Sequence, residues 1–201
     1  MRKLAIAITT CGILFLITSP ALAHETGAES GLGPFGTGFV HPILGIDHLL
    51  AMLSVGILSS MLGRRTIWTL PLTFIGFMVG GALIGQGAGG LASAVVEGAI
   101  ALSVVALGIA IVVDSRIPVG VVFGCVAFFG FFHGYAHGVE TPVWANPAAF
   151  IVGFVAGSAL IHLQGVFLGE IARRMVLWRP VVRGTGGVFA LIGLLAIGGA
   201  I

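Results

Sequence analysis

The chain has 201 residues, of which 58% are hydrophobic and only 8% are charged. Because a soluble domain carries about 25% charged residues, this composition excludes an ordinary water-soluble protein and predicts an all-α, polytopic bundle of helices in a lipid bilayer. The formal net charge of +2, with no basic patch interleaved with aromatic residues, also excludes nucleic acid as a partner.

The amino terminus predicts a secretory signal peptide. Two basic residues precede an apolar run, and Ala21-Leu22-Ala23 forms a small-residue cleavage site. We therefore expect residues 1–23 to be removed and the mature chain to begin at His24. An uncleaved first transmembrane helix is the alternative, but the apolar run is short for a hydrocarbon core about 30 Å thick.

Residues 24–201 predict a single transmembrane bundle without a soluble domain. The glycine-rich stretch 24–40 is expected to be irregular, outside the membrane or dipping into its face. Six apolar runs follow, each long enough to cross the bilayer at about 1.5 Å per helical residue. We place these helices at about 42–62, 66–86, 91–113, 117–137, 147–169 and 182–201.

Positive residues indicate the orientation of this bundle, because they concentrate in cytoplasmic loops. After removal of the signal peptide, all of them fall in the first, third and fifth loops or at their edges: Arg64, Arg65, Arg116, Arg173, Arg174, Arg179 and Arg183. The mature amino terminus and the carboxyl terminus are therefore predicted to be periplasmic, in the inner membrane of a bacterium.

Glycine pairs four residues apart place small residues on one helical face, which is the pattern of close helix crossing. Such pairs are Gly76/Gly80, Gly81/Gly85, Gly120/Gly124 and Gly153/Gly157. With 33 glycines in the chain, some pairs are expected by chance. They therefore serve only as support for a tight bundle.

An ionisable side chain inside hydrocarbon needs a partner, a cavity or a function, because its burial is costly. The first cluster of such residues is His41, Asp47 and His48, at the start of the first predicted helix. Pro42 suits the first helical position, which puts His41 at the helix cap or just outside it. Asp47 is expected to point to a different face from His48. It is either a direct metal ligand or a group that fixes the tautomer of an imidazole.

The second cluster is His133, His137 and Glu140, at the periplasmic end of the fourth predicted helix. The i, i+4, i+7 spacing stacks these side chains on one stripe of a helix. Two imidazoles and a carboxylate form a ligand set for a divalent transition-metal ion. Gly134 and Gly138 leave room for another helix or an ion to approach.

Three further residues are weaker metal-ligand candidates. Glu97 is predicted to lie at the same depth as the two clusters, whereas His162 lies deeper, toward the cytoplasm, with Gln164 near it. A lone membrane histidine is often only an interhelical hydrogen-bonding group, which is the alternative role for His162. His24 would gain a free amine on signal cleavage, and this amine could chelate a metal together with the His24 imidazole.

The two clusters lie in motifs that resemble those of the HupE/UreJ family, the hydrogenase and urease accessory membrane proteins regarded as nickel permeases. HPILGIDHLLAM at 41–52 matches a histidine, five residues and Asp-His, and FHGYAHGVE at 132–140 matches Phe-His-Gly-x-Ala-His-Gly-x-Glu. The resemblance covers essentially the whole chain. It implies a role in moving nickel for His41, Asp47, His48, His133, His137 and Glu140, and it leaves cobalt open as the metal.

These features favour a divalent-metal permease that imports Ni²⁺, with Co²⁺ as the alternative ion, to supply a nickel enzyme such as hydrogenase or urease. The chain has no Walker A loop, so it cannot itself use ATP, and we expect neither an enzymatic activity nor a prosthetic group. The expected partners are the metal ion, the lipid bilayer and cytoplasmic nickel chaperones.

The alternative from a different class is an intramembrane hydrolase that uses Zn²⁺ to activate water. Against a zincin-type site, Gly134 occupies the position of the HExxH glutamate, and Ser158 lacks the GxSxG context of a serine nucleophile. A haem-binding electron carrier would use paired histidines, but the nearby carboxylates of Asp47 and Glu140 favour a divalent ion. A metal sensor or storage protein is a further alternative, which only a flux assay separates from a permease.

Overall fold

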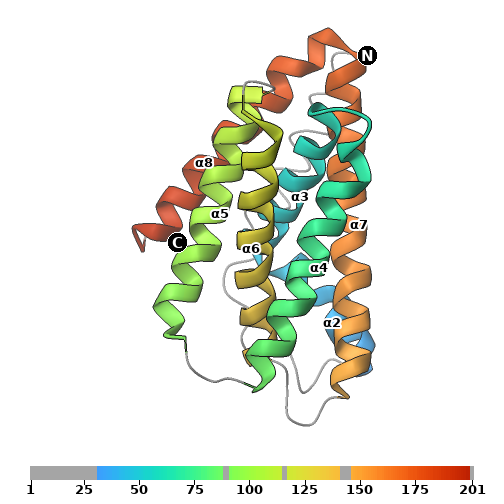
Figure 1. The fold of residues 1–201 in the computed structure, drawn as a ribbon, viewed down its shortest axis with the longest axis vertical. Helices are drawn as coiled ribbons and strands as arrows, with labels where there is room; N and C mark the ends of the chain where they lie inside the picture. The colour runs from blue at the N-terminus through green and yellow to red at the C-terminus, as the bar shows by residue number, and fades with distance from the viewer. Residues whose placement is uncertain (1–30, 88–90, 115–116, 141–145, 200–201) are drawn as a thin grey trace.

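The computed structural model describes residues 31–87, 91–114, 117–140 and 146–199, so the predicted signal peptide and His24 lie outside the described residues. The described residues are helical and contain no strand. Figure 1 shows α2 (Gly33–Leu44), α3 (Ile46–Met61), α4 (Thr66–Gly87), α5 (Ser93–Val113), α6 (Val119–Glu140), α7 (Pro147–Arg174), the 3₁₀ turn η2 (Val176–Trp178) and α8 (Arg179–Ile197).

The helices confirm the predicted polytopic, all-α membrane bundle. Five of the described helices are long and apolar enough to cross a membrane: α4, α5, α6, α7 and α8 with the preceding η2. The pair α2 and α3 passes the same test only as a unit, and its two halves are bent by 79°. The described residues therefore supply five or six spans, in line with the expected six.

The start of the bundle differs from the prediction. A single helix over 42–62 was expected, with an irregular segment before it, but the chain is already helical from Gly33 and breaks at Gly45. Pro42 lies inside α2 rather than at its first position. Both expectations were wrong because α2 packs lengthwise against α7, and this tertiary contact outweighs the weak helix propensity of a glycine-rich stretch.

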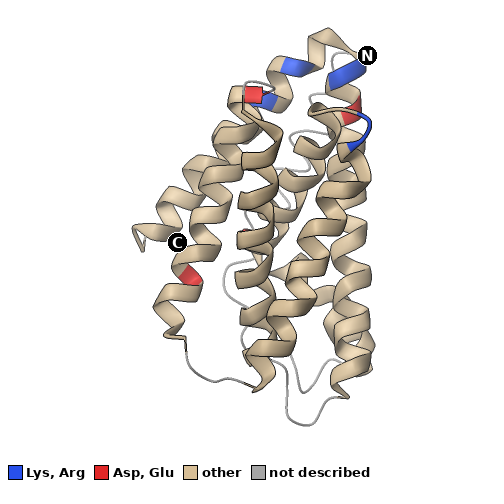
Figure 2. Cartoon of the chain, viewed as in Figure 1, with Lys and Arg blue, Asp and Glu red and all other residues tan. Residues whose placement is uncertain are grey.

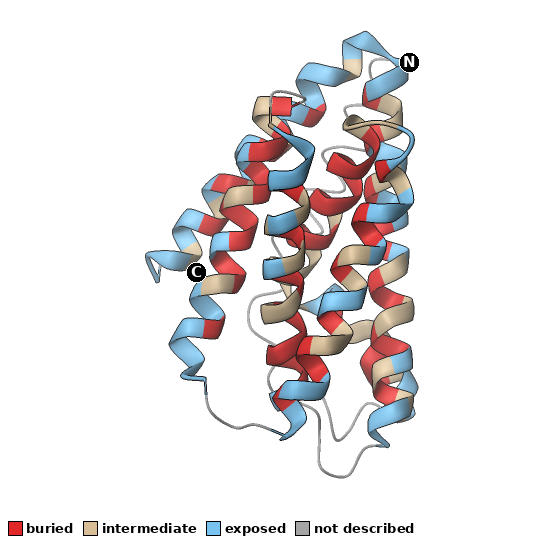
Figure 3. Cartoon of the chain, in the orientation of Figure 1, coloured by how far each residue is buried: buried red, intermediate tan, exposed pale blue. Residues whose placement is uncertain are grey.

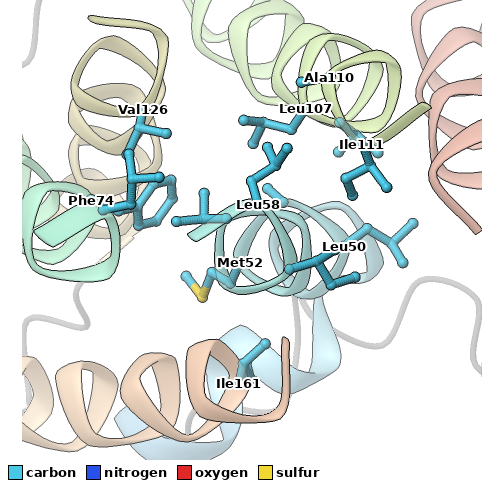
Figure 4. Packing of buried hydrophobic residues seen from close by; sticks show 14 of the residues in the cluster. Leu50, Met52, Leu58, Phe74, Leu107, Ala110, Ile111, Val126 and Ile161 are labelled. Atoms are coloured by element: carbon cyan, nitrogen blue, oxygen red, sulfur yellow. The ribbon is translucent and has the colours of Figure 1, made fainter. Parts of the chain in front are cut away.

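Helix α3 forms the centre of the bundle. Six of its apolar side chains are almost completely buried: Leu50, Ala51, Met52, Val55, Ile57 and Leu58. The serines at 54, 59 and 60 are fully buried. Figure 4 shows α3 residues surrounded by side chains from four other helices: Phe74 of α4, Leu107 and Ile111 of α5, Val126 of α6 and Ile161 of α7. A helix of 16 residues is only about 24 Å long, so α3 depends on its neighbours for its position.

The outer surface is apolar, as lipid contact requires. Large hydrophobic side chains are exposed along the outer faces of the other helices, among them Trp68 and Leu72 of α4, Phe167 of α7 and Leu191 of α8. Figure 3 shows the buried positions turned toward the interior of the bundle and the exposed ones turned outward. The surface thus differs from that of a soluble protein, where exposed positions are mainly polar, although both have an apolar interior.

Glycines bring helix backbones into direct contact. A Cβ atom added at Gly165 of α7 would overlap the Leu53 carbonyl of α3, and one at Gly134 of α6 would overlap the Met78 carbonyl of α4. Of the predicted glycine pairs, Gly81/Gly85 and Gly153/Gly157 lie at such crossings, whereas Gly76/Gly80 and Gly120/Gly124 face open space. Spacing alone therefore did not separate packing glycines from lipid-facing ones.

The charged residues are divided between the two ends of the bundle. Figure 2 shows the basic residues gathered at one end, here called the basic end: Arg64, Arg65, Arg173, Arg174, Arg179 and Arg183. Two acidic residues lie there as well, Asp114 paired with Arg179 and Glu170 paired with Arg173. Glu97 lies near the start of α5, whereas Asp114 follows the end of the same helix.

The packing glycines give a direct test of the fold. Gly165→Val should lower the free energy of unfolding by about 1–3 kcal/mol, because the new side chain has no space against α3. Gly124→Val is the matched control, since Gly124 faces open space on α6. Thermal unfolding of both variants in detergent would show the difference, and equal shifts in Tm would contradict the observed α3–α7 contact.

Candidate metal centre

The break between α2 and α3 brings the first motif together. Gly45 has an extended backbone (φ −79°, ψ 111°), and its N–H bonds weakly to the His41 carbonyl at 3.4 Å, while its carbonyl accepts from Leu49 of α3. A Cβ atom at Gly45 would lie 3.1 Å from Nδ1 of His48 and 3.2 Å from Oδ1 of Asp47. Glycine at this position therefore leaves space for the Asp47–His48 pair.

Four imidazoles from the two motifs form a continuous row. The ring centroids are 4.7 Å apart for His41 and His137, 4.4 Å for His137 and His48, and 4.7 Å for His48 and His133. His133 and His137 of α6 are buried, at 0% and 2% exposure. The row therefore leads from the end of α2, across the start of α3, into the interior of the bundle.

Asp47 fixes the tautomer of His48. One carboxylate oxygen, Oδ1, accepts from the backbone N–H of His48 and lies 2.8 Å from Nδ1 of the ring. A carboxylate oxygen accepts but does not donate, so Nδ1 carries the hydrogen and Nε2 carries the lone pair that can bind a metal ion. The expectation that Asp47 points away from His48 was wrong, because both side chains share the space opened by Gly45.

Ser103 orients His133 in a similar way. The Ser103 hydroxyl donates to the Ile100 carbonyl, and its oxygen lies 2.9 Å from Nε2 of His133. Since a hydroxyl has one hydrogen, the imidazole must donate through Nε2, which leaves the lone pair on Nδ1. In the part of the chain that the structure describes, this buried Nδ1 has no hydrogen-bond partner. The lone pair of this nitrogen is thus fixed in direction inside the bundle.

A cavity of about 780 Å³ opens beside the row of histidines. Its walls include His41, Asp47 and His48, together with Glu97 and the start of α5 and the end of α6. The Tyr135 hydroxyl also lines it and accepts from the backbone N–H of Leu91 at 3.0 Å. The exposed Glu97 thus shares a water-accessible space with the first motif, at the end of the bundle opposite the basic end.

The structure does not bring every predicted ligand into one group. Within the described ranges, no three His, Cys, Asp or Glu side chains are arranged as they would be around one metal ion. His162 lies on α7, and the ring of Phe74 packs against both His162 and His133. Glu140 is the last residue of α6, and its side chain lies outside the described residues. Gln164 is exposed and therefore does not accompany the buried His162.

Two residues that define this geometry, Ser103 and Phe74, were not predicted from the sequence. Ser103 lies in the same predicted helix as Glu97, and a polar residue within an apolar span is a signal that could have identified it. Phe74 is one of 14 phenylalanines in the chain, and nothing in the sequence separates it from the others. Only the packing of α4 against α6 and α7 shows that its ring contacts two histidines.

Comparisons with known proteins agree with the two motifs. The family model described as HupE / UreJ protein matches residues 12–196. The chain belongs to the HupE/UreJ family. It is 37% identical over 182 residues to "Protein HupE" of Rhizobium leguminosarum bv. viciae, which covers 90% of this chain and 92% of the relative. No solved structure matches.

Family membership places this chain among the hydrogenase and urease accessory membrane proteins linked to nickel and cobalt transport. The match extends over all seven described helices, so it covers both histidine motifs and the helices that pack around them. The chain is accordingly a multi-pass membrane protein of a transport and accessory family. The row of imidazoles is the chemical feature within it that suits a transition-metal ion.

The Asp47–His48 pair leads to a prediction on metal affinity. Asp47→Ala should weaken Ni²⁺ binding by about 10–100-fold, because the His48 ring loses the acceptor that fixes its tautomer. Asp47→Asn keeps an acceptor oxygen and should lose less. Titration calorimetry of the purified protein would measure both, with Glu170→Ala at the basic end as a control that leaves affinity unchanged. Equal affinities for all four proteins would contradict the role given to Asp47.

Proposed function

We propose that this protein is a permease of the bacterial inner membrane that carries Ni²⁺, or alternatively Co²⁺, from the periplasm to the cytoplasm. The observation that carries the proposal is the row of four imidazoles, which begins at a cavity open to one end of the bundle and continues into its interior. Imidazole nitrogen is a ligand for both ions, and buried ionisable groups in membrane spans mark ion pathways.

Ligand exchange along the row would move the ion. Adjacent imidazoles are close enough for a bound ion to gain one nitrogen before it leaves another, so that it is never stripped of all ligands in the low-dielectric interior. A site that held the ion with a complete, closed ligand set would retain it instead.

The cavity end is the side from which we propose that the ion enters. Glu97 and Asp47 give this mouth negative charge, which attracts a divalent cation, whereas the opposite end carries the arginines. With the arginines in the cytoplasm, the cavity faces the periplasm. Moving a divalent ion across a potential of about 100 mV, negative inside, releases about 4.6 kcal/mol, so no ATP is needed.

Transport would end with release of the ion to a partner on the cytoplasmic side. Ion capture on the cytoplasmic side would complete the transport, which suits cytoplasmic nickel chaperones and a hydrogenase or urease as the final recipient.

A zincin-type hydrolase is disfavoured because position 134, where its general base would lie, is packed against the Met78 carbonyl and admits no side chain.

Reconstitution in liposomes tests the transport proposal. With a metal-sensitive dye inside and an inside-negative potential, the wild type should show saturable Ni²⁺ influx, and His48→Ala and His133→Ala should reduce it about tenfold or more, since each removes a nitrogen from the row. Cys125→Ser, on α6 but outside the row, is the control. If the protein binds metal but Ni²⁺ influx does not exceed that of empty liposomes, the permease proposal is contradicted. A sensor, storage protein or hydrolase would then be favoured.

Cysteine labelling tests the orientation. In a background with Cys11 and Cys125 replaced by serine, Ser93→Cys at the cavity mouth should react with a membrane-impermeant maleimide in intact spheroplasts. Leu177→Cys, 86% exposed at the basic end, should react only after lysis. The reverse pattern would place the cavity in the cytoplasm and contradict import through it.

A further inference from the structure

His162 is a buried histidine beyond the row of four. Its side chain is 2% exposed, and its Nδ1 lies 2.7 Å from the carbonyl of Ser158, one turn earlier in the same helix. A carbonyl only accepts, so Nδ1 carries the hydrogen and Nε2 carries the lone pair. Nε2 is buried and has no hydrogen-bond partner within the described residues.

This geometry argues against a purely structural role for His162. The expected structural role was a hydrogen bond between helices, but the observed bond lies within α7 and contributes nothing to helix association. The nitrogen that could reach another helix is the one without a partner. Burying an unsatisfied polar atom in a membrane protein is costly, so a transient ligand is the physical reason to keep it.

The ring of Phe74 packs against both His133 of the row and His162. Its centroid is 5.4 Å from that of His133 and 5.3 Å from that of His162, and the ring is completely buried. A divalent ion binds imidazole nitrogen at about 2.1 Å, so a phenyl ring packed against both imidazoles occupies space that an ion passing from one to the other would need. Transfer between these histidines requires the ring to move.

The surroundings of Phe74 restrict which part of it moves. A Cβ atom at Gly130 of α6 would lie only 2.7 Å from the Phe74 carbonyl oxygen, so the α4 backbone is held tightly against α6 at this point. One turn further along α4, Met78 accepts a hydrogen bond from the Ser158 hydroxyl at 3.9 Å, which ties α4 to α7. Rotation of the side chain is thus the available motion, rather than a shift of the helix.

We infer that His162 is a second, inner station for the transported divalent ion and that the ring of Phe74 is the barrier between it and the row of four histidines. This inference rests on the proposed transport function and adds to it a gate of one residue. A hydrophobic constriction closes a pore to water and hydrated ions, while an aromatic face tolerates a passing cation. The arrangement would admit an ion that exchanges imidazole ligands and exclude one that keeps its water.

Variants of both residues test the inference in the liposome assay. His162→Asn keeps a donor near the position of Nδ1 but removes the Nε2 ligand, so Ni²⁺ influx should fall about tenfold or more while equilibrium Ni²⁺ binding to the row stays unchanged. Phe74→Ala should raise Ni²⁺ influx severalfold and admit Mg²⁺, which the wild type excludes because Mg²⁺ dehydrates reluctantly. Phe129→Ala truncates another buried phenylalanine, on α6 and packed against Phe128, and should have neither effect.

The outcomes separate this inference from the transport proposal. If the wild type carries Ni²⁺ but His162→Asn carries it equally well and Phe74→Ala matches Phe129→Ala in both rate and selectivity, the inner station and the gate are wrong and the permease stands. If the wild type shows no influx, the transport proposal fails and the inference falls with it. Loss of influx in His162→Asn with equal loss of Ni²⁺ binding would also overturn a separate inner station.

Discussion

Helix backbones in this protein touch at glycines, along α3 against α7 and along α4 against α6, and this contact determines where the buried histidines lie. In lipid there is little hydrophobic drive to bring helices together, so close packing of small residues supplies the attraction. Gly134 lies between His133 and His137 and is pressed against the Met78 backbone, which fixes the depth of both imidazoles. Gly56 of α3 meets the His162 carbonyl in the same way, so the helix that carries His48 is held against the one that carries His162.

On this framework, three imidazoles are oriented by three different acceptors. His48 has the carboxylate of Asp47, His133 has the hydroxyl of Ser103, and His162 has a backbone carbonyl of its own helix. Only the outermost of these acceptors is charged. A bound cation would therefore be held most strongly at the mouth and less strongly by the neutral interior, where the ion depends on imidazole alone. Weakening ligation along a path favours release, which a permease needs as much as capture.

The break at Gly45 shows where local sequence signals were insufficient. Pro42 favoured a helix that begins at that residue, yet α2 begins nine residues earlier and contains it. The cause is not local, because α2 is stabilised by lying along α7, where Gly153 and Gly157 admit its backbone. The discontinuity has a chemical consequence as well: His41 and His48 flank it, and interrupted helices in transporters place their ligands at such points.

The sequence by itself determined the class of the protein: its apolar composition and spans predict the all-α membrane bundle, the arginines predict one basic end, and the motifs identify the family and most candidate ligands. These features are local, because each is set by the hydropathy of a span or by spacing within one helix. Only the structure decided that Asp47 binds His48, that Ser103 orients His133 and that the Phe74 ring contacts both His133 and His162. The contacts of Ser103 and Phe74 join residues from different helices, and they depend on backbone distances that only packing fixes. The Asp47–His48 contact joins neighbours in α3 and uses the space that Gly45 leaves at the break.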